Sequence, residues 1–332
     1  MKNRNWLSAL VIAAAIILSG AAAAHWLAPR RLRAQEQNSP ARPPITGVAF
    51  IMLRVSSLDA AREYYGHVLG LSESDSGKNV EASSADSGNM TDETLFLKPR
   101  VHYRFYANTH QFVEIVPGLS GPDEDRLIGI GFETANAKEL STYLQSHGVP
   151  TLGALPPPVK GFGVKDPEGR LVAFVEYDSD SGAAGAIAAG KDKIISHRMI
   201  HVGFLVKDQM LEDRFYRDIL NFKEVWHGGM TDKRADWVDM RVPDGADWLE
   251  YMLNVNNPTP QTRGVMNHLA LGVPSVANAY KEVLARGYKA GEPKIGRDGK
   301  WQLNLYDPDL TRAEFMEPKP VETPCCSTFV TH

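Results

Sequence analysis

Two stretches of the chain share one pattern of hydrophobic and polar positions. FIMLRVSSLDAAREYYGHVLGL covers residues 50–71, and HVGFLVKDQMLEDRFYRDILNF covers residues 201–222. In each, an apolar run predicts a strand, an amphipathic stretch with two adjacent aromatic residues predicts a helix, and a turn leads into a second strand. The first position is Phe50 in one copy and His201 in the other. A repeat in which one copy gains a histidine suggests that one copy is scaffold and the other a site.

The C-terminal copy extends into a longer unit. Residues 199–206 alternate as a strand does, and Asp208 is a suitable N-cap for the helix that follows. One face of this helix is apolar, and we expect Phe215 and Tyr216 to lie in the core. Three further strands are predicted at 222–226, 237–242 and 248–253. The unit is therefore βαβββ.

The same unit recurs along the chain. Residues 267–273 predict a strand, 276–286 a helix, and 301–306 and 312–316 two more strands. In the N-terminal half, 129–148 aligns with 268–287, and 166–176 aligns with 307–317. We predict an α+β fold of four βαβββ modules in two tandem domains, at 46–177 and 198–317. The linkers are 35–45 and 178–197, and 318–332 is a tail.

The composition narrows the possible partners. The chain has 332 residues, 43% of them hydrophobic and 23% charged, with a net charge of -4. This is the composition of an ordinary globular protein. Lysine and arginine form no basic stripe with interleaved aromatic residues, which argues against nucleic acid as a partner. A small-molecule substrate is expected instead.

Residues 1–34 do not fit the repeat. Lys2 and Arg4 precede an uncharged run at 6–24, which as a helix would be about 28 Å long, close to the thickness of a bilayer core. Small residues at 21–24 suit signal-peptidase cleavage. The protein is therefore expected to be exported to the periplasm or anchored to the membrane by this segment alone. Three arginines follow the run, so both flanks are positive and the orientation stays open.

The two cysteines, Cys325 and Cys326, are adjacent. Neighbouring Cα atoms are about 3.8 Å apart, below the usual disulfide range of ~4.4–6.8 Å, so a bond between them would be strained. A thiol pair can also bind soft metals or exchange with other thiols. We expect an unstructured tail around them.

Three passages resemble the vicinal oxygen chelate superfamily, which includes glyoxalase I, extradiol dioxygenases, epimerases and bleomycin-resistance proteins. They are HVGFLVKD with FYRDIL, NHLALGV, and DPDLTRAEFME. The resemblance implies that two modules curl into a cup and that metal ligands come from the first and last strands of each module. At those positions in the C-terminal domain stand His201, Glu250, His268 and Glu314.

Two imidazoles with one or two carboxylates suit a single divalent ion of Fe, Mn, Co, Ni or Zn. Each of these four residues interrupts an apolar strand, where a buried polar group requires a partner that a shared metal would supply. Glu250 is either the fourth ligand or a residue that orients a histidine. The corresponding N-terminal positions are Phe50, Glu114, Gly129 and Ala173, so that domain is expected to be structural, a lid, or a metal-free pocket.

Three functions are considered, of which a glyoxalase-like isomerase or lyase is the leading prediction. A glyoxalase-like isomerase or lyase would use Glu250 and Glu314 both as ligands and to move a proton. An extradiol-type dioxygenase would need only His201, His268 and Glu314 on Fe(II). The dioxygenases usually place a histidine upstream of the final glutamate, which this sequence lacks. The third possibility is a non-catalytic protein that binds a small molecule or a metal. Further candidates to line the cup are Trp237, Asp239, Arg241, Tyr306 and Arg312, whose facing the sequence does not fix.

Overall fold

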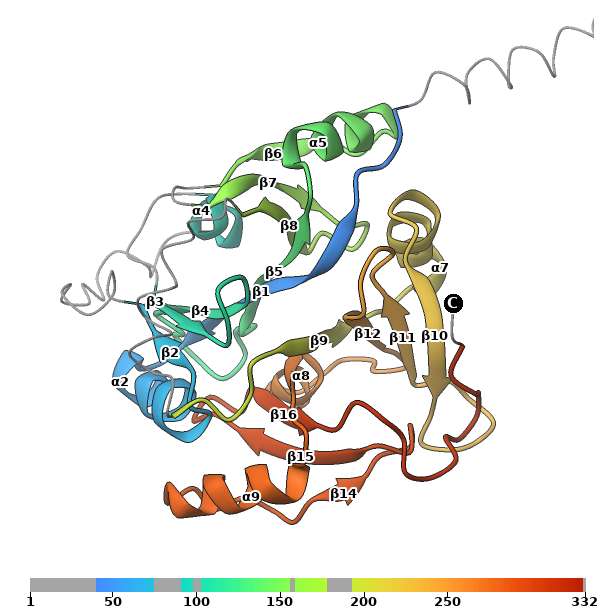
Figure 1. Cartoon of the computed structure of the whole chain (residues 1–332). Coiled ribbons are helices and arrows are strands. Elements are labelled where there is room, and N and C mark those ends of the chain that lie inside the picture. Colours follow the sequence, from blue (N-terminus) through green and yellow to red (C-terminus); the bar gives the residue numbers. More distant parts are fainter. Residues whose placement is uncertain (1–39, 75–90, 98–102, 156–158, 178–192, 331–332) are drawn as a thin grey trace, which may run out of the picture. The chain divides into compact units, whose positions relative to one another are not determined.

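The computed structural model describes residues 40–74, 91–97, 103–155, 159–177 and 193–330 (Figure 1). The expected export or anchor segment at 1–34 lies outside these residues and stays a prediction. Within the described ranges, no helix is both long and apolar enough to cross a membrane. Residues 42–332 form one compact unit, which contains both predicted domains.

The strands form two eight-stranded mixed sheets with the same topology. The N-terminal sheet has, in spatial order, β2 (Ser72–Glu73), β3 (Tyr103–Tyr106), β4 (Phe112–Pro117), β1 (Ile45–Val55), β5 (Leu127–Thr134), β8 (Leu171–Glu176), β7 (Lys160–Lys165) and β6 (Thr151–Ala154). The C-terminal sheet has β10 (Lys223–Gly228), β11 (Trp237–Arg241), β12 (Trp248–Met252), β9 (Met199–Leu205), β13 (His268–Gly272), β16 (Arg312–Met316), β15 (Trp301–Tyr306) and β14 (Lys294–Ile295).

Each sheet consists of two modules joined through their first strands. β1 pairs antiparallel with β5 and parallel with β4, and β9 pairs in the same way with β13 and β12. The predicted α+β fold of four βαβββ modules is confirmed. Strand ends differ from the predicted ones by a few residues, as at β10, because frayed ends carry little pattern.

The helices follow the repeat with one difference. The first helix of each half begins as an α-helix, α2 (Leu58–Ala61) or α7 (Gln209–Asp213), and continues as a π-helix, η1 (Arg62–Val68) or η3 (Arg214–Ile219). Asp208 caps α7 as predicted, accepting a hydrogen bond from the Leu211 amide at 3.1 Å. The wider turn is visible in the hydrogen bond from the Leu220 amide to the Phe215 carbonyl, five residues apart, at 2.9 Å. An amphipathic pattern over so few residues does not distinguish the two helix types.

The remaining helices complete the modules. α5 (Ala137–Ser146) and α9 (Val276–Ala285) agree with the prediction, whereas α4 (Asp92–Leu97) and α8 (Pro260–Met266) were not predicted. Both unpredicted helices are shorter than two full turns, too short for the periodic pattern to identify them.

The outer faces of both sheets and their helices share one hydrophobic core. Phe132 of β5 packs edge-on against Phe222, with ring centroids 5.2 Å apart. Phe215 and Tyr216 are buried in this core, as predicted. This cluster joins the two predicted domains into one packed body.

Two equivalent hydrogen bonds also connect the halves. The Tyr65 hydroxyl donates to the Asp307 carboxylate at 2.9 Å, and the Tyr216 hydroxyl donates to the Asp166 carboxylate at 3.3 Å. Tyr65 and Tyr216 hold the same position in the repeat, as do Asp166 and Asp307. Burial raises the pKa of Asp307 to about 6. Each half thus supplies the phenol of one pair and the carboxylate of the other.

The inner faces of the two sheets differ. In the N-terminal sheet, aromatic side chains occupy the inner face: Phe50 stacks on Phe112 at 5.2 Å, and Phe96 of α4 lies 6.2 Å from Phe50. Gly131 provides the space, because a Cβ there would overlap the Phe50 ring.

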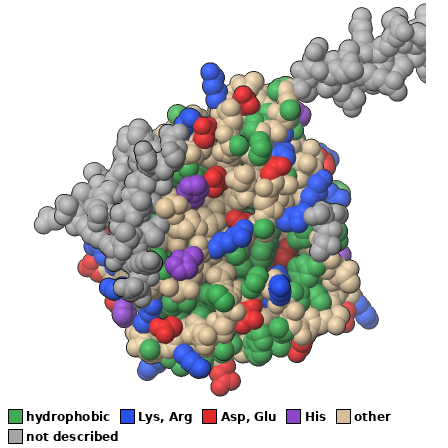
Figure 2. Space-filling view, viewed as in Figure 1, with side chains coloured by type: hydrophobic (Ala, Val, Ile, Leu, Met, Phe, Trp, Pro, Cys, Tyr) green, Lys and Arg blue, Asp and Glu red, His purple; other side chains and the backbone are tan. Residues whose placement is uncertain are grey.

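At the molecular surface seen in Figure 2, acidic and basic side chains are interspersed.

The shared core predicts that the halves unfold together. Phe132→Ala should lower the free energy of unfolding by about 3–5 kcal/mol, because it leaves a cavity between the halves. Leu284→Ala on α9, where the side chain is 44% exposed, is the matched control and should cost much less. Urea titration followed by far-ultraviolet circular dichroism, which reports on both sheets, measures both. Two separate transitions, of which Phe132→Ala shifts only one, would contradict the shared core.

Candidate metal centre

Strand pairing brings the predicted ligands to one face of the C-terminal sheet. Across the sheet, His201 of β9 is paired with Trp248 of β12 and Ala270 of β13, and Ala270 is paired with Glu314 of β16. Gly203, two residues after His201, is paired with Glu250 and His268. Because side chains alternate along a strand, all these positions share one face. We call it the inner face, since the opposite face packs in the hydrophobic core.

Three of the four predicted ligands converge. The Nε2 atoms of His201 and His268 are 3.1 Å apart, and Glu314 Oε2 lies 3.6 Å from His201 Nε2. Potential donor atoms of these three residues all lie within 4.8 Å of one another, and all three residues are buried. With metal–ligand bonds near 2.1 Å, adjacent octahedral donors are about 3 Å apart, so the spacing fits a single ion.

Glu250 takes a different position from the other three. Its Oε2 lies 3.0 Å from His268 Nε2, but it does not belong to the converging group. Its side chain remains 15% exposed, whereas that of Glu314 is 4% exposed. Glu250 therefore stands next to the centre, at the ligating atom of one histidine.

The tautomer of His268 is fixed by its surroundings. His268 Nδ1 lies 2.9 Å from the Met266 carbonyl oxygen, which can only accept, so Nδ1 carries the proton. Burial lowers the pKa of His268 to about 3 and that of His201 well below its usual value. His268 Nε2 then presents a lone pair toward the Glu250 carboxylate, so two electron-rich atoms face each other 3.0 Å apart unless a cation lies between them. The donor set therefore fits a divalent metal ion.

Arg312 holds the third ligand. It precedes Glu314 by two residues on β16, and its Nη1 donates to Glu314 Oε1 at 2.9 Å. The other oxygen, Oε2, remains directed at the histidines. This neighbouring guanidinium orients the carboxylate in the way that residues behind a metal ligand commonly do.

Gly203 is a residue of the site that sequence reasoning missed. A Cβ at this position would overlap the His268 ring. The backbone of β9 must therefore lack a side chain where the imidazole of β13 crosses it. The available signal was the glycine inside the apolar strand MIHVGFL, since a glycine within a strand often marks a close approach.

Aromatic and charged residues surround the histidines. The Trp248 ring packs 4.8 Å from His201, and Lys300 Nζ lies 4.6 Å from the Trp248 ring. Among the suggested lining residues, Asp239 is buried and paired with Glu250 across the strands, and burial raises its pKa well above the usual value. Trp237 and Arg241 belong to the same strand as Asp239, and Tyr306 is exposed at the end of β15.

The equivalent N-terminal positions lack this constellation. Strand pairing relates Phe50 to His201, Gly129 to His268 and Ala173 to Glu314, as the repeat predicted. The remaining carboxylate, Glu114, accepts a hydrogen bond from Arg104 Nε at 3.1 Å. At the positions equivalent to the three converging ligands, the inner face of this sheet therefore carries apolar residues that pack together.

The C-terminal tail corrects one expectation. Residues 318–330 have neither helix nor strand, but they are not unstructured. The Cys325 amide donates to the Arg297 carbonyl at 2.8 Å, and the Val330 amide donates to the Val225 carbonyl at 2.9 Å. The tail thereby joins the loop before β15 to β10, two regions at opposite ends of the sheet order. Main-chain hydrogen bonds of this kind leave no pattern in the sequence.

The tail also reaches the surroundings of the metal centre. Phe329 stacks on Trp226 at 6.1 Å, and Lys300 Nζ lies 4.4 Å from the Phe329 ring and 4.6 Å from the Trp248 ring. Cys325 and Cys326 form a disulfide, the bond that the sequence made seem strained. Their sulfur atoms lie near the exposed Asp232, and this group could bind a metal only after reduction of the disulfide to thiols.

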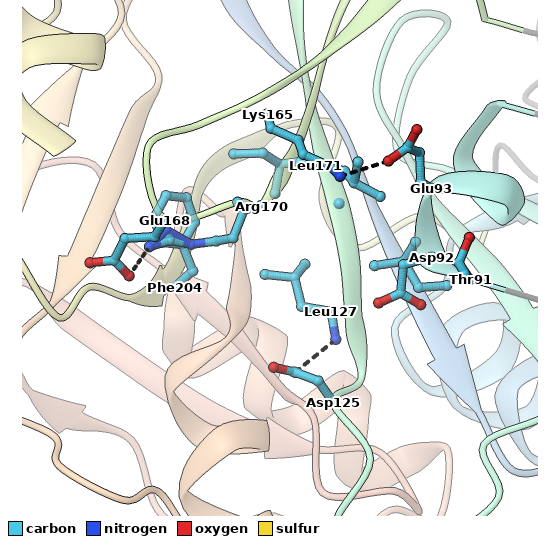
Figure 3. Close-up of a pocket in the computed structure, with 14 residues that line it drawn as sticks. Thr91, Asp92, Glu93, Asp125, Leu127, Lys165, Glu168, Arg170, Leu171 and Phe204 are labelled. Atoms are coloured by element: carbon cyan, nitrogen blue, oxygen red, sulfur yellow. Dashed lines mark hydrogen bonds and ion pairs between the residues drawn. The ribbon is translucent and has the colours of Figure 1, made fainter. Parts of the chain in front are cut away.

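A separate cavity of about 450 Å³ lies where α4 and the β7–β8 turn of the N-terminal half meet β9 (Figure 3). The charged side chains drawn there include two ion pairs: Lys165 with Glu93 at 2.6 Å, and Arg170 with Glu168 at 2.7 Å. Arg170 also lies over the ring of Phe204, 4.0 Å from its centroid. None of the four predicted ligands lines this cavity.

The family model of the Glyoxalase/Bleomycin resistance protein/Dioxygenase superfamily matches residues 198–315. Comparison with curated protein sequences gives no match.

Solved structures resemble both halves. The 2,3-dioxygenase LapB from Pseudomonas sp. KL28 has a TM-score of 0.61 at 14% identity, covering 86% of this chain and 97% of that one. Homoprotocatechuate 2,3-dioxygenase from Brevibacterium fuscum, in complex with 3,4-dihydroxyphenylacetate, has a TM-score of 0.57 at 16% identity, covering 88% and 86%. The Mn(II)-bound glyoxalase from Novosphingobium aromaticivorans has a TM-score of 0.56 at 16% identity, covering 83% of each chain.

At such identities the structural likeness shows the fold alone, whereas the family model identifies the half that carries the converging ligands. The N-terminal half has the same sheet topology with different residues at the ligand positions. Residues 198–315 therefore match the model of this superfamily, and both halves have the fold of the solved structures.

Proposed function

We propose that the protein is a single-metal enzyme that binds a small substrate through two adjacent oxygens and that it acts as a dioxygenase of the extradiol type. The observation that carries this proposal is the group of His201, His268 and Glu314, which converges without Glu250. Two histidines and one carboxylate on one side of an octahedral ion leave three positions, enough for a bidentate substrate and a third ligand. The metal would supply Lewis acidity and a place for oxygen.

The residues of the chain then have separate roles. His201 and His268 are neutral and present Nε2, and Arg312 keeps Glu314 Oε2 directed toward them. Glu250 is partly exposed and accepts the proton of a substrate hydroxyl as that oxygen binds. The rings of Trp248 and Phe329 help to exclude water from this side of the inner face.

A glyoxalase-like isomerase or lyase is the second candidate, and one contact favours it. Glu250 Oε2 lies 3.0 Å from His268 Nε2, a spacing that suits two ligands of one ion. A small rotation of the Glu250 side chain would give four ligands, with a carboxylate free to move a proton between substrate carbons. Two positions would remain open, enough for the substrate alone.

The proposal predicts one divalent ion per chain. The protein purified without a metal-binding tag should contain about one equivalent of Fe, Mn, Co, Ni or Zn by elemental analysis. His201→Gln should lose most of it, because the variant removes one of three ligands. His110→Gln, a histidine of the N-terminal half, is the matched control and should retain it. Equal metal content in both variants would refute the site.

The depressed histidine pKa values predict an unusual titration. In the metal-free protein, the imidazole Cε1–H signals of His201 and His268 should not shift between pH 8 and pH 5, because burial keeps both rings neutral throughout. A free imidazole titrates with a pKa of about 6.5. Proton NMR, with assignment through the two histidine-to-glutamine variants, measures this directly. A titration midpoint near 6.5 for either ring would contradict the burial argument.

Glu250 distinguishes the two chemistries. If three residues bind the metal, Glu250→Gln should keep its metal and lower turnover by about 10²–10⁴-fold, as loss of a general base does. Glu314→Gln should lose the metal itself. Wild-type protein loaded with Fe(II) should consume oxygen with catechols, measured with an oxygen electrode. Comparable metal loss in both variants, without oxygen uptake by the wild type, would favour the isomerase or lyase.

A further inference from the structure

Arg312 has hydrogen-bonding capacity that the metal centre does not use. Nη1 is paired with Glu314, but Nε and Nη2 are buried and have no partner within the residues that the structure describes. A buried guanidinium N–H without an acceptor is costly. Nε and Nη2 form one edge of the guanidinium, with two parallel donors at the spacing of the two oxygens of a carboxylate.

Other cationic groups surround the same face. Lys300 is buried between the rings of Trp248 and Phe329, and its nearest carboxylate, Asp298, is 3.4 Å away. Arg241, which is paired with Trp248 across the strands, has a buried Nε without a partner in the described part of the chain. The two arginines thus present donors on either side of the histidines.

The charges of this face do not balance without a ligand. A divalent ion together with three cationic side chains outweighs four carboxylates by one charge. The cationic side chains are Arg241, Lys300 and Arg312, and the carboxylates are Asp239, Asp298, Glu250 and Glu314. A positive, largely desolvated face favours an anionic ligand.

We propose that the substrate carries a carboxylate beside its two chelating oxygens and that Arg312 binds this carboxylate through Nε and Nη2. The inference rests on the proposed function, because it names the substrate class of the same metal centre. The chelating oxygens have the metal as their partner, whereas the Arg312 edge needs an acceptor with two oxygens. Arg312 is therefore both a positioning residue for Glu314 and a binding residue for the substrate.

The test compares two ligands of the same shape and different charge. Metal-loaded full-length protein is titrated without oxygen, by calorimetry, with 3,4-dihydroxybenzoate and with 3,4-dihydroxybenzamide. The wild type should bind the carboxylate at least about 10-fold more tightly, as expected for a charge-assisted bidentate contact. Arg312→Gln should bind both about equally, at the affinity of the wild type for the amide. Arg312→Lys, which keeps the charge but not the fork, should recover only part of the preference.

Controls separate this inference from the metal site. The metal content of each variant is measured first, and the titrations are run at equal metal loading. Arg217→Gln, an exposed arginine on η3, is the matched control and should keep the wild-type preference. Equal binding of both ligands by the wild type would overturn the inference and leave the proposed function standing. A preference that survives in Arg312→Gln would overturn the role of Arg312. Failure of both ligands to bind the wild type would overturn the proposed function and the inference with it.

Discussion

The structure depends on one electrostatic constraint. On the inner face of the C-terminal sheet, potential metal-ligand atoms that carry lone pairs lie close to one another. His268 donates its Nδ1 proton to a carbonyl, and its Nε2 faces His201 at 3.1 Å and Glu250 at 3.0 Å. Burial keeps both rings neutral, so His268 Nε2 has no proton to donate to Glu250, and the two rings are bridged either by an Nε2 proton of His201 or by a shared cation. A shared cation resolves this repulsion, and it explains why polar residues interrupt four otherwise apolar strands.

The duplication explains how one half can hold such a site. Both halves have the same sheet topology, and each contributes a tyrosine to one connecting hydrogen bond and an aspartate to the other. Their outer faces share a core, so the N-terminal half stabilises the body without needing a site of its own. Its inner face is accordingly filled by Phe50, Phe96 and Phe112. The C-terminal inner face instead keeps buried polar atoms without partners, which is costly unless a metal and a ligand bind there.

The sequence predicted the four modules and the positions of His201, His268 and Glu314, because strand alternation and the repeat register are local properties that a single chain displays. It did not separate Glu250 from the other three, since that difference depends on side-chain placement between paired strands. Gly203 and Arg312 were not recognised in their present roles, because each acts on a residue of another strand or on a neighbour's carboxylate. The packed tail was also missed, since it is held by main-chain hydrogen bonds and by contacts between residues far apart in sequence.

The most direct test of the account is the position of the metal in a crystal of the protein grown without added chelator. Anomalous diffraction at the absorption edge of the ion found by elemental analysis locates it without reference to sequence. We expect one peak per chain, about 2.0–2.4 Å from His201 Nε2, His268 Nε2 and a Glu314 oxygen. A main peak at any other place, such as Asp232 and the cysteine pair, would contradict the account. So would a C-terminal inner face without any peak.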